Sequence, residues 1–398
     1  MISQLMKLIW NRRKRNVMTS LGIFISFLVL FLVLTIVVKT VGNYFKDQGY
    51  NTDKVWFITF NWKEADFAEI KETLVQINLM IESDAQIENY SYARTYIYSP
   101  WVMSATNLEY NDKGLSCHIA WSDREMAKVL SVPLSDGRWF SEADIPDTEY
   151  ESIVVSQMLV DDFFADGEGV GKVLERGDER YRIIGVIPEF RNASRFSDSR
   201  RIFFRQTFHT AEDFTDFRES MGQRILLKIP DKLNAAGEMA LLKKLNRIAP
   251  AWTFDVRPLN ALKNQATMVT LLLPGILGIV SIFMLVNVGL GLFGVIWYQT
   301  ERRKSEVGLR RALGAPVKKV YQQIIGEAMI LTTFSILWGI LFAIQFPLLQ
   351  VFPAVEISTY SQALLLAIAI IYGITFLCAL YPSKQAINIE PAEALHYE

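Results

Sequence analysis

One turn in this chain has the residue types that bind a phosphate. It spans residues 166–173, with the sequence DGEGVGKV. A nucleotide-binding loop needs a glycine five residues before the Gly-Lys pair and a hydroxyl residue directly after that pair, but this chain has Asp166 and Val173 there. The turn therefore fails as an ATP site, and we interpret Gly171 and Lys172 as part of a tight turn between strands.

Other catalytic combinations are also incomplete. The three histidines, His118, His209 and His396, have no metal-ligating residue at helical or hairpin spacing. Ser156 precedes two aspartates but has neither a histidine base nor a nucleophile elbow. We therefore predict that the chain is not an enzyme and has no catalytic, cofactor-binding or metal site.

The charged segment 301–316, ERRKSEVGLRRALGAP, carries more information. Glu306 lies four residues before Arg310, which favours a short helix, and Gly314 is a typical helix terminator. Pro316 is suited to the first position of a following helix, where its missing N–H costs nothing. We predict a rigid bend between two helices. The alternative is a basic anchor on anionic lipid.

The elements that position this bend are apolar. Four long stretches lack charged residues: 16–38, 265–300, 328–355 and 357–383. A bilayer core about 30 Å thick needs roughly 20 apolar residues in a helix, so each stretch is long enough to span it. About 230 residues separate the first stretch from the second. We therefore predict four transmembrane helices, arranged one plus three, and one large domain outside the bilayer.

The basic residues set the predicted orientation. Five of them and no acid precede the first span, and basic residues also dominate segment 301–320, whereas the short connection 350–360 has only Glu356. By the positive-inside rule, both termini and segment 301–320 are cytoplasmic. We interpret the first span as an uncleaved anchor, since it is longer than a signal-peptide core and no Ala-x-Ala pattern follows it. Nucleic-acid binding is disfavoured because the basic clusters flank the spans.

The outer domain has two similar halves. Residues 55–60, 65–81 and 90–102 have strand, helix and strand patterns, and the order recurs at 224–229, 233–248 and 252–256. We predict that the two halves form one split α/β sandwich. Cys117 and Cys378 fall in different regions and are predicted not to pair.

The insert between the halves has turns and shorter strands. We predict a strand at 152–156, a helix at 157–164 and a strand at 181–186. Residues 189–220 are polar and aromatic, and a long segment of this kind is either a mobile loop or a binding surface. We favour the mobile loop.

The bend resembles the cytoplasmic segment of the MacB/FtsX-like permeases of ABC transporters. The candidate coupling residues are Glu301, Arg302, Glu306, Val307, Gly308, Arg310, Arg311, Leu313, Gly314 and Ala315. Val307 departs mildly from the isoleucine of the family pattern. The resemblance continues at Glu327-Ala328 and in the tail at Pro382, Ala386, Pro391 and Ala394-Leu395. Outer-domain matches are residues 137–140 (GRWF), 154–156 (VVS), 171–172 (GK) and 184–186 (IGV).

This resemblance implies a dimeric permease, either homodimer or heterodimer, driven by a separate cytoplasmic ABC ATPase subunit in a bacterial inner membrane. ATP and magnesium would be bound by that ATPase and not by this chain. The bend would dock on the ATPase and relay its motion to the outer domains, a process called mechanotransmission, for export or efflux. A periplasmic adaptor and an outer-membrane channel are further partners that the resemblance implies. The alternative is an FtsX-like signalling or scaffold protein that regulates an extracytoplasmic partner such as a cell-wall hydrolase.

The predicted boundaries follow from these patterns. The cytoplasmic N-terminus is 1–16, the first span 17–41, the outer domain 42–265 with halves 42–102 and 223–260 around insert 103–222, the second span with its stalk 266–300, the coupling segment 301–320, the third span 321–349, the outer loop 350–360, the fourth span 361–381 and the tail 382–398.

Two further residues are candidates. Glu327 at the edge of the third span either reaches the membrane interface or pairs with a basic group of the bend or of the ATPase. Pro274 lies near the outer end of the second span, where it is predicted to kink the stalk.

Overall fold

The computed structural model describes residues 13–62, 65–93, 97–98, 104–144, 149–207, 224–229, 235–302, 316–352 and 355–387. The chain divides into two compact units. Unit 1 comprises Met1–Gly42 and Leu272–Glu398, and unit 2 comprises Asn43–Leu271. Each unit has its own hydrophobic core.

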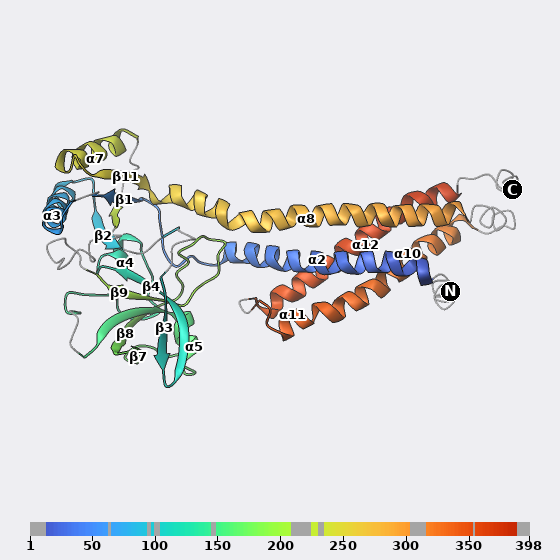
Figure 1. Cartoon of the computed structure of the whole chain (residues 1–398), viewed down its shortest axis with the longest axis horizontal. Helices are drawn as coiled ribbons and strands as arrows, with labels where there is room; N and C mark the ends of the chain where they lie inside the picture. The colour runs from blue at the N-terminus through green and yellow to red at the C-terminus, as the bar shows by residue number, and fades with distance from the viewer. Residues whose placement is uncertain are drawn as a thin grey trace. The chain divides into compact units, whose positions relative to one another are not determined.

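Among the described residues, four helices are long and apolar enough to cross a membrane. They are α2 (Arg13–Phe45), α8 (Leu259–Glu301), α10 (Val317–Ala343) and α12 (Ile357–Ile387), and the short α11 (Gln345–Leu348) follows α10 (Figure 1). The predicted one-plus-three arrangement of spans is confirmed.

Small and hydroxyl residues join the helices of unit 1. A Cβ atom on Gly339 of α10 would lie 2.3 Å from the Phe27 ring of α2, so only glycine allows this approach. Thr332 of α10 bonds Thr375 of α12 at 3.1 Å between their hydroxyl oxygens. Cys378 of α12 donates to the Gly289 carbonyl of α8 at 3.3 Å. Close approach and hydroxyl bonds of this kind stabilise helix pairs where water is absent.

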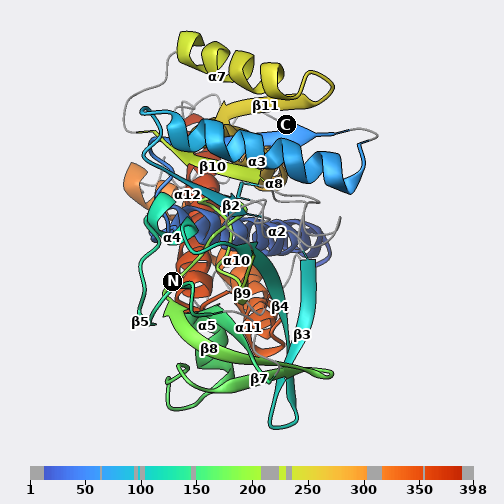
Figure 2. The same cartoon turned by 90° about the vertical axis from the view of Figure 1, so that its left-hand side faces the viewer.

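In unit 2, the two predicted halves share one sheet. The first half is β1 (Val55–Asn61), α3 (Phe67–Ser83) and β2 (Asn89–Ala93), and the second is β10 (Arg224–Lys228), α7 (Ala235–Ile248) and β11 (Thr253–Pro258). The strand order is β11-β1-β10-β2, with antiparallel pairs throughout. Both helices lie on the same face of this sheet (Figure 2). The prediction of a split α/β sandwich is therefore confirmed.

Helix α3 shows why this face is apolar. Asp66 caps its start by accepting a hydrogen bond from the backbone N–H of Glu69 at 2.8 Å. Its buried residues recur every three to four positions, at Ile70, Leu74, Ile77 and Ile81. This stripe covers one face of the sheet, as its spacing predicts.

The insert is a closed barrel. It comprises β3 (Ser104–Tyr110), β4 (Lys113–Ser122), α4 (Met126–Val129), β5 (Asp136–Gly137), β6 (Glu151–Ser156), α5 (Gln157–Phe163), β7 (Val173–Arg176), β8 (Glu179–Ile187) and β9 (Ile202–Gln206). Its strands pair in the order β4-β3-β7-β8-β6-β9, and β9 pairs back to β4 in parallel. Closure leaves few unpaired edges.

The structure corrects several details of the predictions for unit 2. Strands of the insert are not short, since β4 has 10 residues and β8 has 9. The segment 189–220 is not simply a mobile loop, because Phe190 and Arg191 are buried and β9 belongs to the barrel; residues 208–223 lie outside the described part of the chain. Of the strand predicted at 90–102, the structure describes β2 to Ala93, and residues 94–96 and 99–102 lie outside the described part of the chain.

The loop that begins at Gly137 is held by an aspartate. Gly137 has φ +69°, and a Cβ atom there would lie 2.3 Å from the Ile184 carbonyl oxygen, so this position requires glycine. Arg138 donates to both carboxylate oxygens of Asp144, at 2.5 and 2.7 Å, and the Ser141 backbone N–H donates to one of them at 2.8 Å. Burial raises the pKa of Asp144, but the hydrogen bonds from Arg138 and Ser141 outweigh it and lower this pKa to about 2.

We expect Asp144→Asn to destabilise the fold by an amount that depends on pH. A lowered folded-state pKa means that the carboxylate stabilises the fold above its unfolded value near 3.9, and that this contribution is lost as pH falls toward 2. The unfolding midpoint of the variant should lie below that of the wild type at pH 6, and the difference should shrink between about pH 5 and 2. Thermal unfolding of the detergent-purified chain at a series of pH values measures this difference in midpoint. Asp112→Asn, in the exposed β3–β4 turn, is the control. A difference that does not change with pH would contradict this role.

Candidate functional site

Two of the ten predicted coupling residues lie in the described part of the chain. Glu301 is the last residue of helix α8, and Arg302 lies in the turn that follows it. The other predicted coupling residues, Glu306, Val307, Gly308, Arg310, Arg311, Leu313, Gly314 and Ala315, lie outside the described residues. The structure therefore describes the two flanks of the predicted bend.

The first flank is an aromatic cluster at the end of α8. The Trp297 ring stacks on Tyr381 of α12, with centroids 5.8 Å apart and planes 13° apart, and Phe293 contacts both rings. The guanidinium of Arg302 lies 4.8 Å from the Tyr298 ring centroid. Side chains packed in this way hold the end of α8 against α12, so the two helix ends are expected to move together.

A small apolar cluster extends this contact to the third helix. Ile296 of α8, Ala328 of α10 and Ala379 of α12 are buried together. The residue before Ala328, Glu327, is partly buried and accepts a hydrogen bond from the Gln323 side chain at 3.4 Å. This bond lies within one helix, so pairing of Glu327 with the bend or with the ATPase stays a prediction.

The second flank starts at Pro316. It has φ −66° and ψ 141°, an extended conformation, and serves as the N-cap of α10. The prediction that Pro316 is the first helical residue is therefore wrong by one position, because the helix begins at Val317. The fixed φ of proline still orients the chain as it enters the helix.

Pro274 lies inside helix α8. The helix begins at Leu259, seven residues before the predicted start of the second span and its stalk at residue 266. Leu259 and Ala266 are 2% and 1% exposed in the core of unit 2, which explains the earlier start. A proline nitrogen has no hydrogen to donate to the carbonyl four residues earlier, here that of Thr270. The kink predicted at Pro274 stays a prediction.

The ends of two other helices also differ from the predicted boundaries. Helix α12 begins at Ile357, inside the predicted outer loop 350–360, and continues to Ile387 in the predicted tail. Helix α2 continues to Phe45, beyond the predicted end at residue 41. Lys39 and Lys384 end uncharged stretches without ending the helices that contain them.

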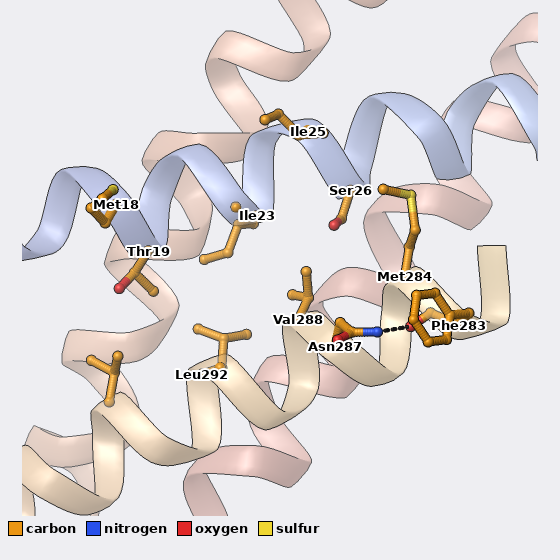
Figure 3. Close-up of a pocket in the computed structure, with 13 residues that line it drawn as sticks. Met18, Thr19, Ile23, Ile25, Ser26, Phe283, Met284, Asn287, Val288 and Leu292 are labelled. Atoms are coloured by element: carbon orange, nitrogen blue, oxygen red, sulfur yellow. Dashed lines mark hydrogen bonds between the residues drawn. The ribbon is translucent and has the colours of Figure 1, made fainter. Parts of the chain in front are cut away.

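Between α2 and α8, unit 1 has an open apolar groove of about 470 Å³ (Figure 3). Met18, Thr19, Ile23 and Ser26 line it from α2, and Phe283, Met284, Asn287, Val288 and Leu292 line it from α8. The Asn287 side chain donates to the Phe283 carbonyl of its own helix at 2.8 Å. Its amide is therefore partly satisfied within α8, and the groove is suited to apolar chains.

A second candidate region lies in unit 2, at the last turn of α2. Arg191 is 2% exposed and is among the largest fully buried side chains described. It donates to the backbone carbonyl of Asn43 at 2.8 Å and to the Glu189 carboxylate at 2.8 Å. A cation suits this place because the final carbonyls of a helix carry partial negative charge. The sequence does not single out this residue, since one arginine among several carries no pattern that indicates burial.

Hydrogen bonds continue from Arg191 toward the start of α8. The Tyr50 hydroxyl donates to the Arg191 carbonyl at 3.0 Å, and the Gln48 amide donates to that hydroxyl at 2.8 Å. Burial raises the pKa of Tyr50 well above its ordinary value, which keeps the hydroxyl protonated as a donor.

The network ends at the first turn of α8. The Tyr98 hydroxyl lies 3.4 Å from the Gln48 amide oxygen and 3.3 Å from the Thr52 hydroxyl. Thr52 in turn donates to the Asn260 side chain at 2.7 Å. One polar network within unit 2 therefore joins the last turn of α2 to the first turn of α8. We name it the junction network.

Gly49 allows the chain to pass through this network. Its φ is +84°, and a Cβ atom there would lie 1.7 Å from the Glu189 carbonyl oxygen. Only glycine fits, because both the conformation and the contact exclude a side chain. This constraint fixes Glu189 and Arg191 against residues 48–50.

The candidate ligand groups and the glycine-rich turn are predicted to have structural roles. Across residues 13–387, with the gaps given above, no group of three or more His, Cys, Asp or Glu residues could hold a metal ion. The glycine-rich turn is closed by its own ion pair, since Lys172 donates to both carboxylate oxygens of Asp166 at 2.7 and 2.8 Å. This lysine is therefore engaged within the turn, as a structural role requires.

Two family models match the chain. The MacB-like periplasmic core domain matches residues 17–244, and the FtsX-like permease C-terminal domain matches residues 278–391. These two matches cover both units.

Curated relatives show the same similarity over most of the chain. A macrolide export ATP-binding/permease protein MacB of Bradyrhizobium diazoefficiens is 23% identical over 398 residues, 97% of this chain and 58% of that protein. MacB 2 of Yersinia pestis bv. Antiqua is 23% identical over 347 residues, 84% of this chain and 49% of that protein. The chain thus spans about half the length of these curated relatives.

Among solved structures, the periplasmic region of MacB from Actinobacillus actinomycetemcomitans is similar. It has a TM-score of 0.37 and 14% identity, and the match covers 54% of this chain and 93% of that one. The extracellular domain of the noncanonic ABC-type transporter YknZ from Gram-positive bacteria has a TM-score of 0.33 and 9% identity, with coverage of 50% of this chain and 99% of that one.

Proposed function

Because this chain belongs to the MacB/FtsX-like family of ABC transporter permeases, we propose that it couples ATP hydrolysis by a separate cytoplasmic ATPase subunit to conformational change outside the membrane. The coupled process is export or efflux. In this proposal the chain binds neither ATP nor magnesium, which belong to the ATPase. Segment 301–316 is the docking site for that subunit.

The observation that carries this proposal is the continuity of two helices. Helices α2 and α8 each contribute residues to both units without a break. Helix α8 has 43 residues, so at 1.5 Å per residue it is about 65 Å long. A helix of this length exceeds the roughly 30 Å hydrocarbon core. In this proposal a displacement at its coupling end is passed along the helix to residues buried in the core of unit 2.

The proposed orientation follows from charge. Basic residues dominate before α2 and in the segment between α8 and α10, so both termini and that segment face the cytoplasm. Unit 2 is then extracytoplasmic, as expected of a periplasmic core domain.

The function is tested by co-purification. The full chain, expressed with a candidate ABC ATPase encoded beside it, should form a stable complex and alter the ATPase rate on reconstitution. An outer unit that instead binds a cell-wall hydrolase, with no export defect after deletion of the chain, would favour the signalling alternative.

A second permease subunit completes the proposed assembly. Only 6% of the most apolar stretch of α8 is buried within the described chain, compared with 28 to 39% in the other three spans. Ile279, Phe283, Val286 and Leu290 are 54 to 71% exposed at a spacing that places them on one face. We propose that a second subunit covers this face.

We expect cysteine cross-linking to detect that subunit if both copies are this chain. In a background of Cys117→Ser and Cys378→Ala, Ile279→Cys should give a disulfide-linked dimer in oxidised membranes. Leu292→Cys is the matched control, since Leu292 is 4% exposed within the chain. Equal yields at both positions, or monomers only at Ile279→Cys, would contradict a homodimer formed through this face.

A further inference from the structure

The last turn of α2 ends in a cluster of aromatic rings. The Tyr44 ring stacks on Phe196, with centroids 5.1 Å apart, and meets the edge of Phe45 at 5.5 Å. The guanidinium carbon of Arg195 lies 4.8 Å from the Tyr44 ring centroid. Phe45 is 79% exposed and Tyr44 is 41% exposed. We name Tyr44, Phe45, Arg195 and Phe196 the interface cluster.

Hydrogen bonds fix this cluster on the helix. The side-chain amide of Asn43 donates to the Phe196 carbonyl at 3.2 Å and to the Asp198 carboxylate at 2.9 Å. A turn between Ser194 and Ser197 holds the loop, with the Ser197 hydroxyl donating to the Ser194 carbonyl at 2.6 Å. The position of Arg195 is therefore set by the end of α2.

The surface of the membrane is expected near the end of a helix that spans it. Helix α2 is one of the four candidate spans; its uncharged stretch ends at Val38, and Tyr44 and Phe45 follow about two helical turns later. Aromatic residues concentrate at this depth, because their rings suit the boundary between acyl chains and head groups. The interface cluster therefore lies at the head-group level of the leaflet in which α2 ends.

The arginines of this segment differ in how they are satisfied. Arg191, Arg201 and Arg205 each donate to a carboxylate, of Glu189, Asp162 and Glu151. The Nε of Arg195 and the Nη1 of Arg200, by contrast, are buried and have no hydrogen-bond partner among the described residues. The carboxylate of Asp198 interacts electrostatically with Arg200 and also accepts a hydrogen bond from the Asn43 amide.

A phosphodiester would supply hydrogen-bond acceptors and negative charge to these guanidinium groups. Arginine binds phosphate oxygens through two parallel N–H donors, and a lipid phosphate lies at the depth of the interface cluster. We propose that Arg195, with Arg200 adding positive charge, binds the phosphate of an anionic phospholipid, while Phe45 and Phe196 contact the upper part of its acyl chains. This site lies outside the coupling function and does not depend on the ATPase.

The test compares anionic and neutral lipid on the full chain. Dioleoylphosphatidylglycerol, titrated into the chain in neutral detergent, should raise its unfolding midpoint by about 3 °C more than dioleoylphosphatidylcholine does. Arg195→Gln with Arg200→Gln should lose this difference, and Arg195→Lys should keep part of it, since lysine retains the charge without the planar fork. Arg195→Lys also tests the site if the double variant does not fold.

Two controls make the result decisive. Arg180→Gln removes the same charge from the exposed β7–β8 hairpin, where Arg180 lies 3.6 Å from Glu175, and should keep the full lipid effect. Inorganic phosphate at the same concentration should give no shift. An equal shift with inorganic phosphate, or an unchanged lipid effect in both Arg195 variants, would overturn the proposal.

Discussion

Replacement of Arg191 by methionine is expected to lower the free energy of unfolding by about 3 kcal/mol, since removing one member of a buried ion pair typically costs about 3 to 5 kcal/mol. We take the lower end because the Glu189 side chain is 32% exposed, so part of its charge stays in water. Methionine retains much of the packing volume. The loss would come from the Asn43 carbonyl, which is left without its donor, and from the unpaired carboxylate. Denaturant unfolding of the detergent-purified chain, followed by tryptophan fluorescence, measures the change.

A double variant separates charge from packing. Glu189→Gln combined with Arg191→Met removes the uncompensated carboxylate and should recover part of the loss. Arg257→Met is the matched control: this arginine pairs with Asp255 at 2.7 Å, but its side chain is 55% exposed, so the expected change is at most about 1 kcal/mol. If Arg191→Met unfolded at the same denaturant concentration as Arg257→Met, Arg191 would not stabilise the junction network.

Local patterns were sufficient to predict the four spans and the two halves of unit 2. Each of these elements is defined by residues close together in sequence, such as the apolar stripe of α3. Their pairing in one sheet was also predicted, because two strand-helix-strand units commonly share a sheet, but the order β11-β1-β10-β2 came from the structure.

Long-range features could not be predicted in the same way. Barrel closure depends on the pairing of β9 with β4, whose residues are about 85 positions apart in sequence, as for His118 and Ile202. Residues 189–200 looked like a loop because they are polar, yet Arg191 is buried through bonds to residues about 150 positions earlier. Hydropathy also placed the start of α8 too late, since a helix that enters a folded core contains polar residues such as Asn260.

The predicted coupling residues depend on sequence resemblance more than on geometry. The structure shows that their flanks are held by packed side chains, Trp297 on Tyr381 and Ile296 on Ala328. A docking segment attached to such a support would pass a displacement to three helices at once. Its residues from 303 to 315 lie outside the described chain.

We therefore expect Glu306→Ala with Arg310→Ala to weaken binding of the ATPase subunit about 100-fold. Two charge-assisted hydrogen bonds at an interface contribute about 1.5 kcal/mol each, and about 3 kcal/mol corresponds to this change in Kd. Titration of the purified ATPase onto the permease in nanodiscs measures Kd, and the stimulated ATPase rate should fall in parallel. Asp255→Ala with Arg257→Ala is the matched control, because it removes one acid and one base from the exposed strand β11.

The same variants separate docking from the alternative of a lipid anchor. A basic anchor would make the loss depend on anionic lipid, since each charge near such a surface contributes about 1 kcal/mol. Docking predicts the same loss of affinity in nanodiscs of neutral lipid, where that attraction is absent. If the double variant kept the wild-type Kd and the wild-type stimulated ATPase rate in neutral nanodiscs, segment 301–316 would not be part of the coupling path. This would hold even if the complex remained stable. The ATPase would then have to contact another part of the cytoplasmic face, such as the end of α12 near Lys384.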